Sequence, residues 1–138
     1  MGTLPEGKVV VMWVDDEPGL LRVVERLADD QTEMVTAPSA LHALQVLERR
    51  RVDIVVSDEH MPGMCGVRLL ETISQKWPET IRVLITGQPD PALFRRSVNG
   101  ASVERILVKP IDTNTLREEL GALVNDCLAR RSTPVPAP

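Results

Sequence analysis

The segment VVSDEHMPGMCG, residues 55–66, carries a short apolar run into an acidic turn and on to a glycine. Apolar runs of this length, bounded by turn residues, are typical of strands buried in a parallel sheet. The same plan recurs along the chain, and we predict strands at residues 8–14, 53–57, 81–85 and 104–108. A weaker fifth strand, 33–36, lies between two helical patterns, and Pro38 follows it.

Helical periodicity follows each predicted strand. The helix around residues 92–99 is the least amphipathic, and Gly100 is suited to end it. Strands that alternate with helices of this length predict βαβ units, right-handed crossovers and a parallel sheet. The predicted fold class is therefore α/β: a doubly wound (βα)5 fold, with a five-stranded parallel sheet and helices on both faces. Besides the helix at 92–99, four helices are predicted from apolar residues at helical spacing. Their apolar stripes are Leu20, Val24, Leu27 and Ala28; Leu41, Leu44 and Leu47; Val67, Leu70, Ile73 and Trp77; and Leu116, Leu120, Leu123, Val124, Cys127 and Leu128.

Length and composition restrict the class of protein. The 138 residues fit one domain, and 43% hydrophobic with 26% charged residues is ordinary globular usage. We expect an N-terminal extension at residues 1–7, one domain at 8–131 and a proline-rich tail or linker at 132–138, whose STPVPAP composition cannot continue a helix.

Several partners are disfavoured by the same composition. With two Trp, one Phe, no Tyr and a net charge of −4, the chain lacks stacking platforms and basic character, so we expect no direct nucleic-acid partner. Cys65 and Cys127 lie far apart without a CxxC pair, which indicates neither a disulfide framework nor a zinc site. No apolar stretch resembles a signal peptide or membrane span, so we expect a cytoplasmic location and no membrane contact.

Polar residues gather where the predicted strands end. Because ligands of open parallel sheets bind outside the carboxyl ends of the strands, these residues are candidates for one site. They are Asp15, Asp16 and Glu17 after the first strand, Asp58 after the third, Thr86 and Gly87 after the fourth, and Lys109 and Pro110 after the fifth.

Clustered carboxylates at this rim indicate a cation. Two carboxylates about 4 Å apart repel by roughly 4 kcal/mol at an effective dielectric of about 20. Mg²⁺, which binds through a few carboxylates and keeps positions for water and phosphate oxygens, relieves that repulsion. We predict a cage of Asp15, Asp16 and Asp58, with Lys109 and the Thr86 hydroxyl available to phosphate oxygens.

Four motifs occur in order: VDDEP, VVSDEHMPGMCG, VLITG and ILVKP. Together they resemble the receiver domain of two-component response regulators, over about residues 8–130. Each motif alone is weak, but four in order on four strand ends form a specific pattern. The resemblance implies the CheY-like, flavodoxin-like version of the predicted fold.

The resemblance also implies roles for single residues. Asp58 would be the nucleophile and phosphoacceptor; Asp16, Asp58 and the His60 backbone carbonyl would bind Mg²⁺, with Mn²⁺ as a substitute, and Asp15 would act largely through water. Lys109 would neutralise the transferred group, Thr86 would move toward it, and Pro110 would follow a peptide bond that favours cis. Of the remaining positions, Gln88 and His60 would tune the phosphate lifetime. The sequence itself leaves two roles open for Glu17: it tunes metal binding, or it is an ordinary acidic residue at the start of a helix in which Pro18 is an early residue.

The implied partners are a sensor histidine kinase or phosphotransfer protein, and a downstream output domain, protein partner or second copy of the chain. The domain would not be an enzyme in its own right, since it would assist only its own aspartyl phosphorylation and dephosphorylation. One position departs from the family pattern: Ile106 stands where receivers commonly carry Tyr or Phe. Readout through burial of an aromatic ring is thereby put in question.

Two other functions compete with a phosphorylation switch. A haloacid-dehalogenase-like phosphatase also uses Asp, Mg²⁺, Thr and Lys, but it needs a second Asp two residues after the nucleophile, where this chain has His60. That function is rejected. A constitutive interaction module, or a phosphate sink or shuttle, stays open because of Ile106.

Overall fold

The computed structural model describes residues 7–132, which form one five-stranded parallel sheet flanked by five helices. The predicted extension and tail fall almost wholly outside this range. The elements are β1 Val9–Val14, α1 Pro18–Glu25, β2 Thr32–Ala37, α2 Ala40–Arg49, β3 Ile54–Asp58, α3 Gly66–Lys76, β4 Ile81–Thr86, α4 Pro91–Asn99, β5 Arg105–Val108 and α5 Thr113–Ser132.

The strands lie in the order β2-β1-β3-β4-β5, and every pair is parallel. The predicted fold class is confirmed. The chain winds in one direction through β2 and in the other from β3 onward, so the order reverses between β1 and β3. Ligands of such sheets bind at this reversal, outside the carboxyl ends of the strands.

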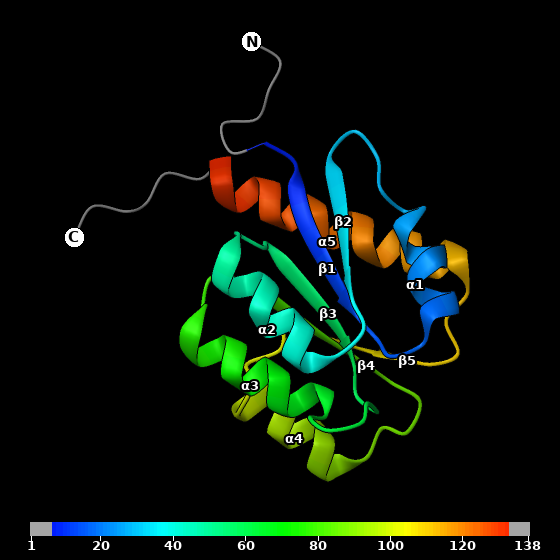
Figure 1. The fold of residues 1–138 in the computed structure, drawn as a ribbon, viewed down its shortest axis with the longest axis vertical. Coiled ribbons are helices and arrows are strands. Elements are labelled where there is room, and N and C mark those ends of the chain that lie inside the picture. The colour runs from blue at the N-terminus through cyan, green and yellow to red at the C-terminus, as the bar shows by residue number, and fades with distance from the viewer. Residues whose placement is uncertain (1–6, 133–138) are drawn as a thin grey trace, which may run out of the picture.

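The sheet separates two hydrophobic layers. Figure 1 shows α2, α3 and α4 on one side of the sheet and α1 and α5 on the other. Side chains of β1 alternate between them: Val10, Met12 and Val14 pack toward α2 and α3, whereas Val9, Val11 and Trp13 pack toward α1 and α5. Trp13, 2% exposed, is a core residue as its position in a buried strand predicts.

Two predicted helical stripes are partly wrong. Residues Leu27 and Ala28 follow α1, whose end tightens into turns in which the Leu27 N–H binds the Val24 carbonyl three residues back. In α2 the buried residues are Ala40, Ala43 and Leu47; of the predicted stripe, Leu47 is buried, Leu44 is half-buried and Leu41 is 67% exposed. The smaller residues Ala40 and Ala43 occupy buried positions next to the predicted Leu41 and Leu44.

Gly100 ends α4 as predicted, although its φ is −89° and its N–H simply continues the helical bonding to the Arg96 carbonyl. The left-handed residue of this loop is Ser102, with φ of 50°. Both cysteines are free, as predicted, with Cys65 half-buried and Cys127 buried. Among the described residues, no helix is long and apolar enough to cross a membrane.

A buried guanidinium ties together the loops at the amino ends of β4 and β5. Arg82, 8% exposed, donates to the carbonyl oxygens of Pro78 and Thr80 before β4 and of Ala101 and Ser102 before β5, at 2.6–3.3 Å. Burial lowers the pKa of Arg82, with the charge of Glu104 opposing that effect. The cation is therefore solvated by backbone carbonyls, as water would solvate it outside.

Replacing Arg82 by Met should reduce the free energy of unfolding by about 3 kcal/mol, because several buried carbonyls lose their donors. Urea denaturation checks this value. Arg95→Met, at an exposed position of α4, is the control and should change stability by less than about 0.5 kcal/mol. Equal losses in the two variants would contradict the structural role given to Arg82.

Candidate functional site

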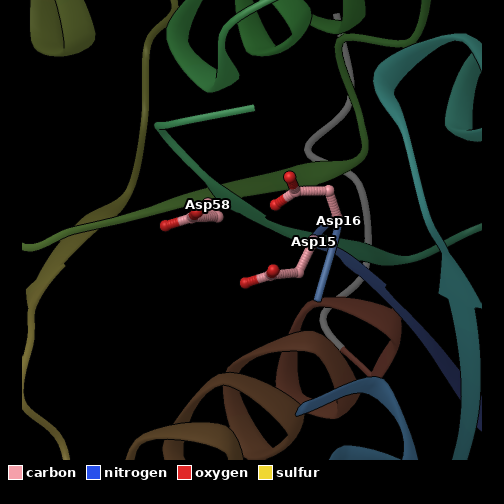
Figure 2. Close-up of side chains that lie close together, drawn as sticks. All are labelled: Asp15, Asp16 and Asp58. Atoms are coloured by element: carbon pink, nitrogen blue, oxygen red, sulfur yellow. The ribbon is translucent and has the colours of Figure 1, made fainter. Parts of the chain in front are cut away.

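Three carboxylates meet at the reversal of strand order. Asp15 and Asp16 follow β1, and Asp58 is the last residue of β3. One oxygen from each lies within 4.8 Å of the others, and Figure 2 shows the three side chains gathered beyond the strand ends. Asp15 and Asp58 are 3% and 7% exposed, whereas Asp16 is exposed. The cluster is thus open to solvent on one side.

Lys109 supplies the positive charge at this cluster. Its Nζ lies 2.9 Å from Asp58 Oδ1 and 4.0 Å from Asp15 Oδ2. The Lys109 backbone N–H donates to the Thr86 carbonyl at 2.9 Å, which extends the β4–β5 pairing to this residue. The lysine stem therefore starts from a fixed point at the sheet edge.

The charges at the cluster are unevenly balanced. Burial raises the pKa of Asp15, and the nearby charges of Asp58 and Asp16 add to the effect, while the Glu17 N–H and Lys109 oppose it. Burial lowers the pKa of Lys109, but its hydrogen bond to Asp58 and the charges of Asp58 and Asp15 outweigh this and raise the pKa. One ammonium thus faces three carboxylates, and a further cation would be favoured.

Thr86 and Gln88 lie beside one another after β4. The Thr86 side chain is fully buried, and its Oγ1 accepts a hydrogen bond from the Gln88 N–H at 3.1 Å. The Gln88 side chain is exposed. A Cβ at Gly87 would make only ordinary contact, 3.8 Å from the Lys109 Cβ, so steric need does not explain this glycine.

Glu17, His60 and Ile106 occupy three different settings. The Glu17 N–H donates to Asp15 Oδ1 at 2.9 Å, while its exposed side chain makes no cap bond to α1, which begins with Pro18. The side chain of His60 is exposed in the loop after β3. Ile106 is half-buried and packs against the core layer under α2, α3 and α4. The Lys109–Pro110 bond is cis, in agreement with the sequence prediction.

Gly66 and Glu59 were missed by the sequence analysis. A Cβ at Gly66 would lie 2.9 Å from the Asp58 carbonyl carbon and from the Glu59 Cα, and closer still to the Asp58 carbonyl oxygen. The first residue of α3 therefore rests directly on the peptide that follows Asp58. The glycine at the end of VVSDEHMPGMCG was the available signal, because Gly is the usual residue where backbone must approach closely.

The donor set fits Mg²⁺. Asp15, Asp16 and Asp58 offer hard carboxylate oxygens, and the exposed side of the cluster leaves space for water and phosphate oxygens. No His or Cys ligand joins the three carboxylates, which disfavours zinc among the described residues.

Comparisons with known proteins agree with this geometry. A model of the response regulator receiver domain matches residues 11–121. The fold and the matched family model define a class of signalling domains, and the chain belongs to the response regulator receiver domain family. Receiver domains are regulatory signalling domains of two-component systems rather than a family of catalytic enzymes.

Two transcriptional regulatory proteins are similar in sequence to this chain. The chain is 31% identical to the hydrogenase transcriptional regulatory protein HoxA of Cupriavidus necator, covering 96% of the chain and 30% of HoxA. It is 32% identical to the transcriptional regulatory protein GlrR of Escherichia coli, covering 80% of the chain and 25% of GlrR. The chain therefore spans about a quarter to a third of these regulators.

Solved structures also resemble this fold. The signal receiver domain of an HD domain-containing protein from Pseudomonas fluorescens superposes with a TM-score of 0.80 at 32% identity, covering 92% of this chain and 99% of that one. A CheY-like receiver from Methanospirillum hungatei, at 21% identity, reaches a TM-score of 0.82 and shows the same fold.

Removing the Asp15 charge should stabilise the metal-free protein at neutral pH. Folded Asp15 keeps its proton to a higher pH than the unfolded chain does, so stability falls as pH rises through the folded pKa. Asp15→Asn retains an acceptor oxygen for the Glu17 N–H but cannot lose a proton.

In the presence of a chelator, Asp15→Asn should melt at a higher temperature than wild type at pH 7. The difference should vanish well below about pH 3.9, where Asp15 is protonated in both the folded and the unfolded protein. Added Mg²⁺ should raise the wild-type melting temperature more than that of the variant. A difference between the two proteins that does not change with pH would contradict the assignment of buried charge to Asp15.

Gly66→Ala should lower the free energy of unfolding by about 2 kcal/mol, because the added methyl group meets rigid backbone. The control is Gly121→Ala in α5, where a Cβ would meet open space and Ala favours the helix by about 0.5–1 kcal/mol. Chemical denaturation of both variants measures the contrast. Equal effects would show that α3 does not depend on close approach at Gly66.

Proposed function

We propose that this domain accepts a phosphoryl group on Asp58 from the phosphohistidine of a sensor kinase or phosphotransfer protein. The single observation that carries the proposal is the 2.9 Å contact between Lys109 Nζ and Asp58 Oδ1, within a cluster that also holds Asp15 and Asp16. A paired lysine at a solvent-open cluster of carboxylates is suited to an incoming phosphate, since the ammonium can contact both.

The chain's own groups have defined tasks in this reaction. An Asp58 carboxylate oxygen attacks phosphorus, the P–N bond of the phosphohistidine breaks, and the imidazole leaves with the bonding electron pair and takes up a proton. Lys109 neutralises charge on the phosphoryl oxygens. Mg²⁺, held by Asp15, Asp16, Asp58 and the His60 backbone carbonyl, would screen the like charges of carboxylate and phosphate; Mn²⁺ would serve as a substitute.

Thr86, Gln88 and Glu17 act on the phosphorylated form in this proposal. The Thr86 hydroxyl would exchange its bond with the Gln88 N–H for a phosphoryl oxygen. The exposed Gln88 and His60 side chains would govern water access and so the lifetime of the acyl phosphate. Glu17 would add negative charge near the metal. The phosphoryl group would therefore be added to Asp58 and later lost by hydrolysis, and the domain would not act on other substrates.

A protein donor is favoured by the surface beside Lys109. An apolar cavity of about 520 Å³ opens there, between α1 and the segment after β5. Because Glu17 and Lys109 line it, a protein that delivers a phosphoryl group to Asp58 would contact this apolar surface. Its other lining residues are Trp13, Leu20, Ile85, Pro110, Ile111 and Leu116.

The response would be read on α4 and β5. Phe94 and Val98 lie one turn apart on α4 and are 58% and 45% exposed, and Val108 at the end of β5 is 48% exposed. Such apolar side chains suit an output domain, a protein partner or a second copy of the chain, whose binding phosphorylation would favour. We place this signalling in the cytoplasm, where a sensor kinase would act.

A phosphate sink or shuttle is the second candidate, and Ile106 favours it. Ile106 is half-buried in the core layer and offers no ring to turn inward. Phosphorylation could then occur without a change at α4 and β5.

Incubation with Mg²⁺ and a small-molecule phosphodonor should add the mass of one phosphoryl group to wild type and none to Asp58→Ala. In parallel, beryllofluoride with Mg²⁺ should shift amide NMR signals of the site and of α4 and α5 in wild type alone. Site shifts that do not reach these helices would favour the sink, and modification that persists in Asp58→Ala would overturn the proposed acceptor.

A further inference from the structure

The start of α3 is capped by a residue from outside the helix. Its N-cap, Cys65, makes no side-chain cap bond. Instead Glu59 Oε1 accepts from the Val67 N–H at 2.7 Å, the bond that an N-cap Ser or Asp side chain normally accepts at the second or third helical residue. A carboxylate at this end also interacts favourably with the helix dipole.

Glu59 is held by its backbone as well. Its N–H donates to the Ile85 carbonyl at 2.9 Å, and its own carbonyl accepts from the Gly66 N–H at 3.0 Å. The residue directly after the acceptor is therefore bonded to β4 on one side and, twice, to the first turn of α3 on the other. Residues 59–66 form a closed loop with Glu59 at its base.

Closure of this loop brings the start of α3 against the backbone of the candidate site. Gly66 rests on the Asp58–Glu59 peptide, so a shift of α3 away from Glu59 would release that peptide. This peptide belongs to the Asp58 backbone, and Glu59 alone separates Asp58 from His60, so its position bears on both candidate ligands. Groups that orient metal ligands from behind commonly change metal affinity by about 10–100-fold when removed.

We infer that Glu59 is a positioning residue for the metal and phosphoacceptor site, acting through the hydrogen bond from its carboxylate to the Val67 N–H. Its side chain is half-buried and is not part of the carboxylate cluster of Asp15, Asp16 and Asp58. Glu59 therefore acts on the ligands without being one. The inference rests on the proposed function of Asp58 and names what holds that residue in place.

The test compares three variants. Glu59→Met keeps the length of the side chain and removes the acceptor; Glu59→Gln keeps an acceptor oxygen and removes the charge. Ser39→Ala removes a comparable cap from α2, where Ser39 Oγ accepts from the His42 N–H at 3.1 Å. Mg²⁺ affinity is measured by amide NMR shifts of Asp15 and Asp58, and loop closure by hydrogen exchange at the Val67 amide.

Glu59→Met should weaken Mg²⁺ binding about 10-fold and speed exchange at Val67. Glu59→Gln should stay within about two-fold of wild type, because its amide oxygen still accepts the hydrogen bond. The Ser39→Ala variant also loses a helix cap, so it should unfold at a lower urea concentration than wild type, but its Mg²⁺ affinity should be unchanged.

Equal Mg²⁺ affinities of Glu59→Met and wild type would overturn the inference and leave Glu59 as an ordinary helix cap. Equal weakening in Glu59→Met and Glu59→Gln would also overturn it, because charge rather than the hydrogen bond would then matter. Failure of wild type to bind Mg²⁺ at all, with Asp58→Ala behaving identically, would instead overturn the proposed function.

Discussion

Repulsion among Asp15, Asp16 and Asp58 is the constraint on which the rest of the structure depends. Two of the three are almost fully buried, and among the described residues Lys109 is the cation that pairs with them. An arrangement of this kind is unfavourable in isolation, since each carboxylate raises the cost of ionising its neighbours. The hydrophobic layers on both sides of the sheet supply the stability that keeps it. Binding of a cation would therefore stabilise the folded protein, because it would relieve the repulsion among the three carboxylates.

The sheet order explains why these residues meet. The positions of Asp15 after β1 and Asp58 at the end of β3 are 43 residues apart in sequence, yet β1 and β3 are adjacent strands with Val14 paired to Ser57. Lys109 reaches the same rim because β5 pairs with β4 and its backbone continues that pairing to Thr86. Each of these candidate site residues stands at or directly after the end of a strand rather than on a long loop, which limits its freedom.

Much of this was accessible from sequence because parallel strands have a simple signature. Short apolar runs ending in polar residues located β1, β3, β4 and β5, and strand ends in a parallel sheet must share one edge. Less accessible was anything set by close approach. The alanines of α2 were overlooked in favour of Leu41, and the roles of Gly66 and Glu59 arise from backbone contact across the loop, which residue type alone does not reveal.

The burial of Arg82 is a second feature that the sequence does not predict. An arginine in an apolar strand would ordinarily predict an edge or a solvent-facing position, but here carbonyls of two loops replace water around the guanidinium. The spacing of residues in the sequence does not predict that four carbonyl oxygens surround the Arg82 guanidinium. The hydrogen bonds of Arg82 thereby tie the loop that carries Ala101 and Ser102 to β4, but they do not reach α4, the helix before that loop.

That helix, α4, buries few of its side chains. Of its nine residues only Ser97 is fully buried, and Arg96 pairs with Glu71 of α3 through two hydrogen bonds of 2.8 Å near the solvent. Exposed pairs of this kind contribute little to stability, about 0–1 kcal/mol. Moving α4 therefore sacrifices less apolar burial than moving α3, which buries Val67, Leu69, Leu70 and Ile73. A phosphoryl group at Asp58 would need to redirect only a weakly anchored helix, so a response at α4 does not require an aromatic ring in place of Ile106.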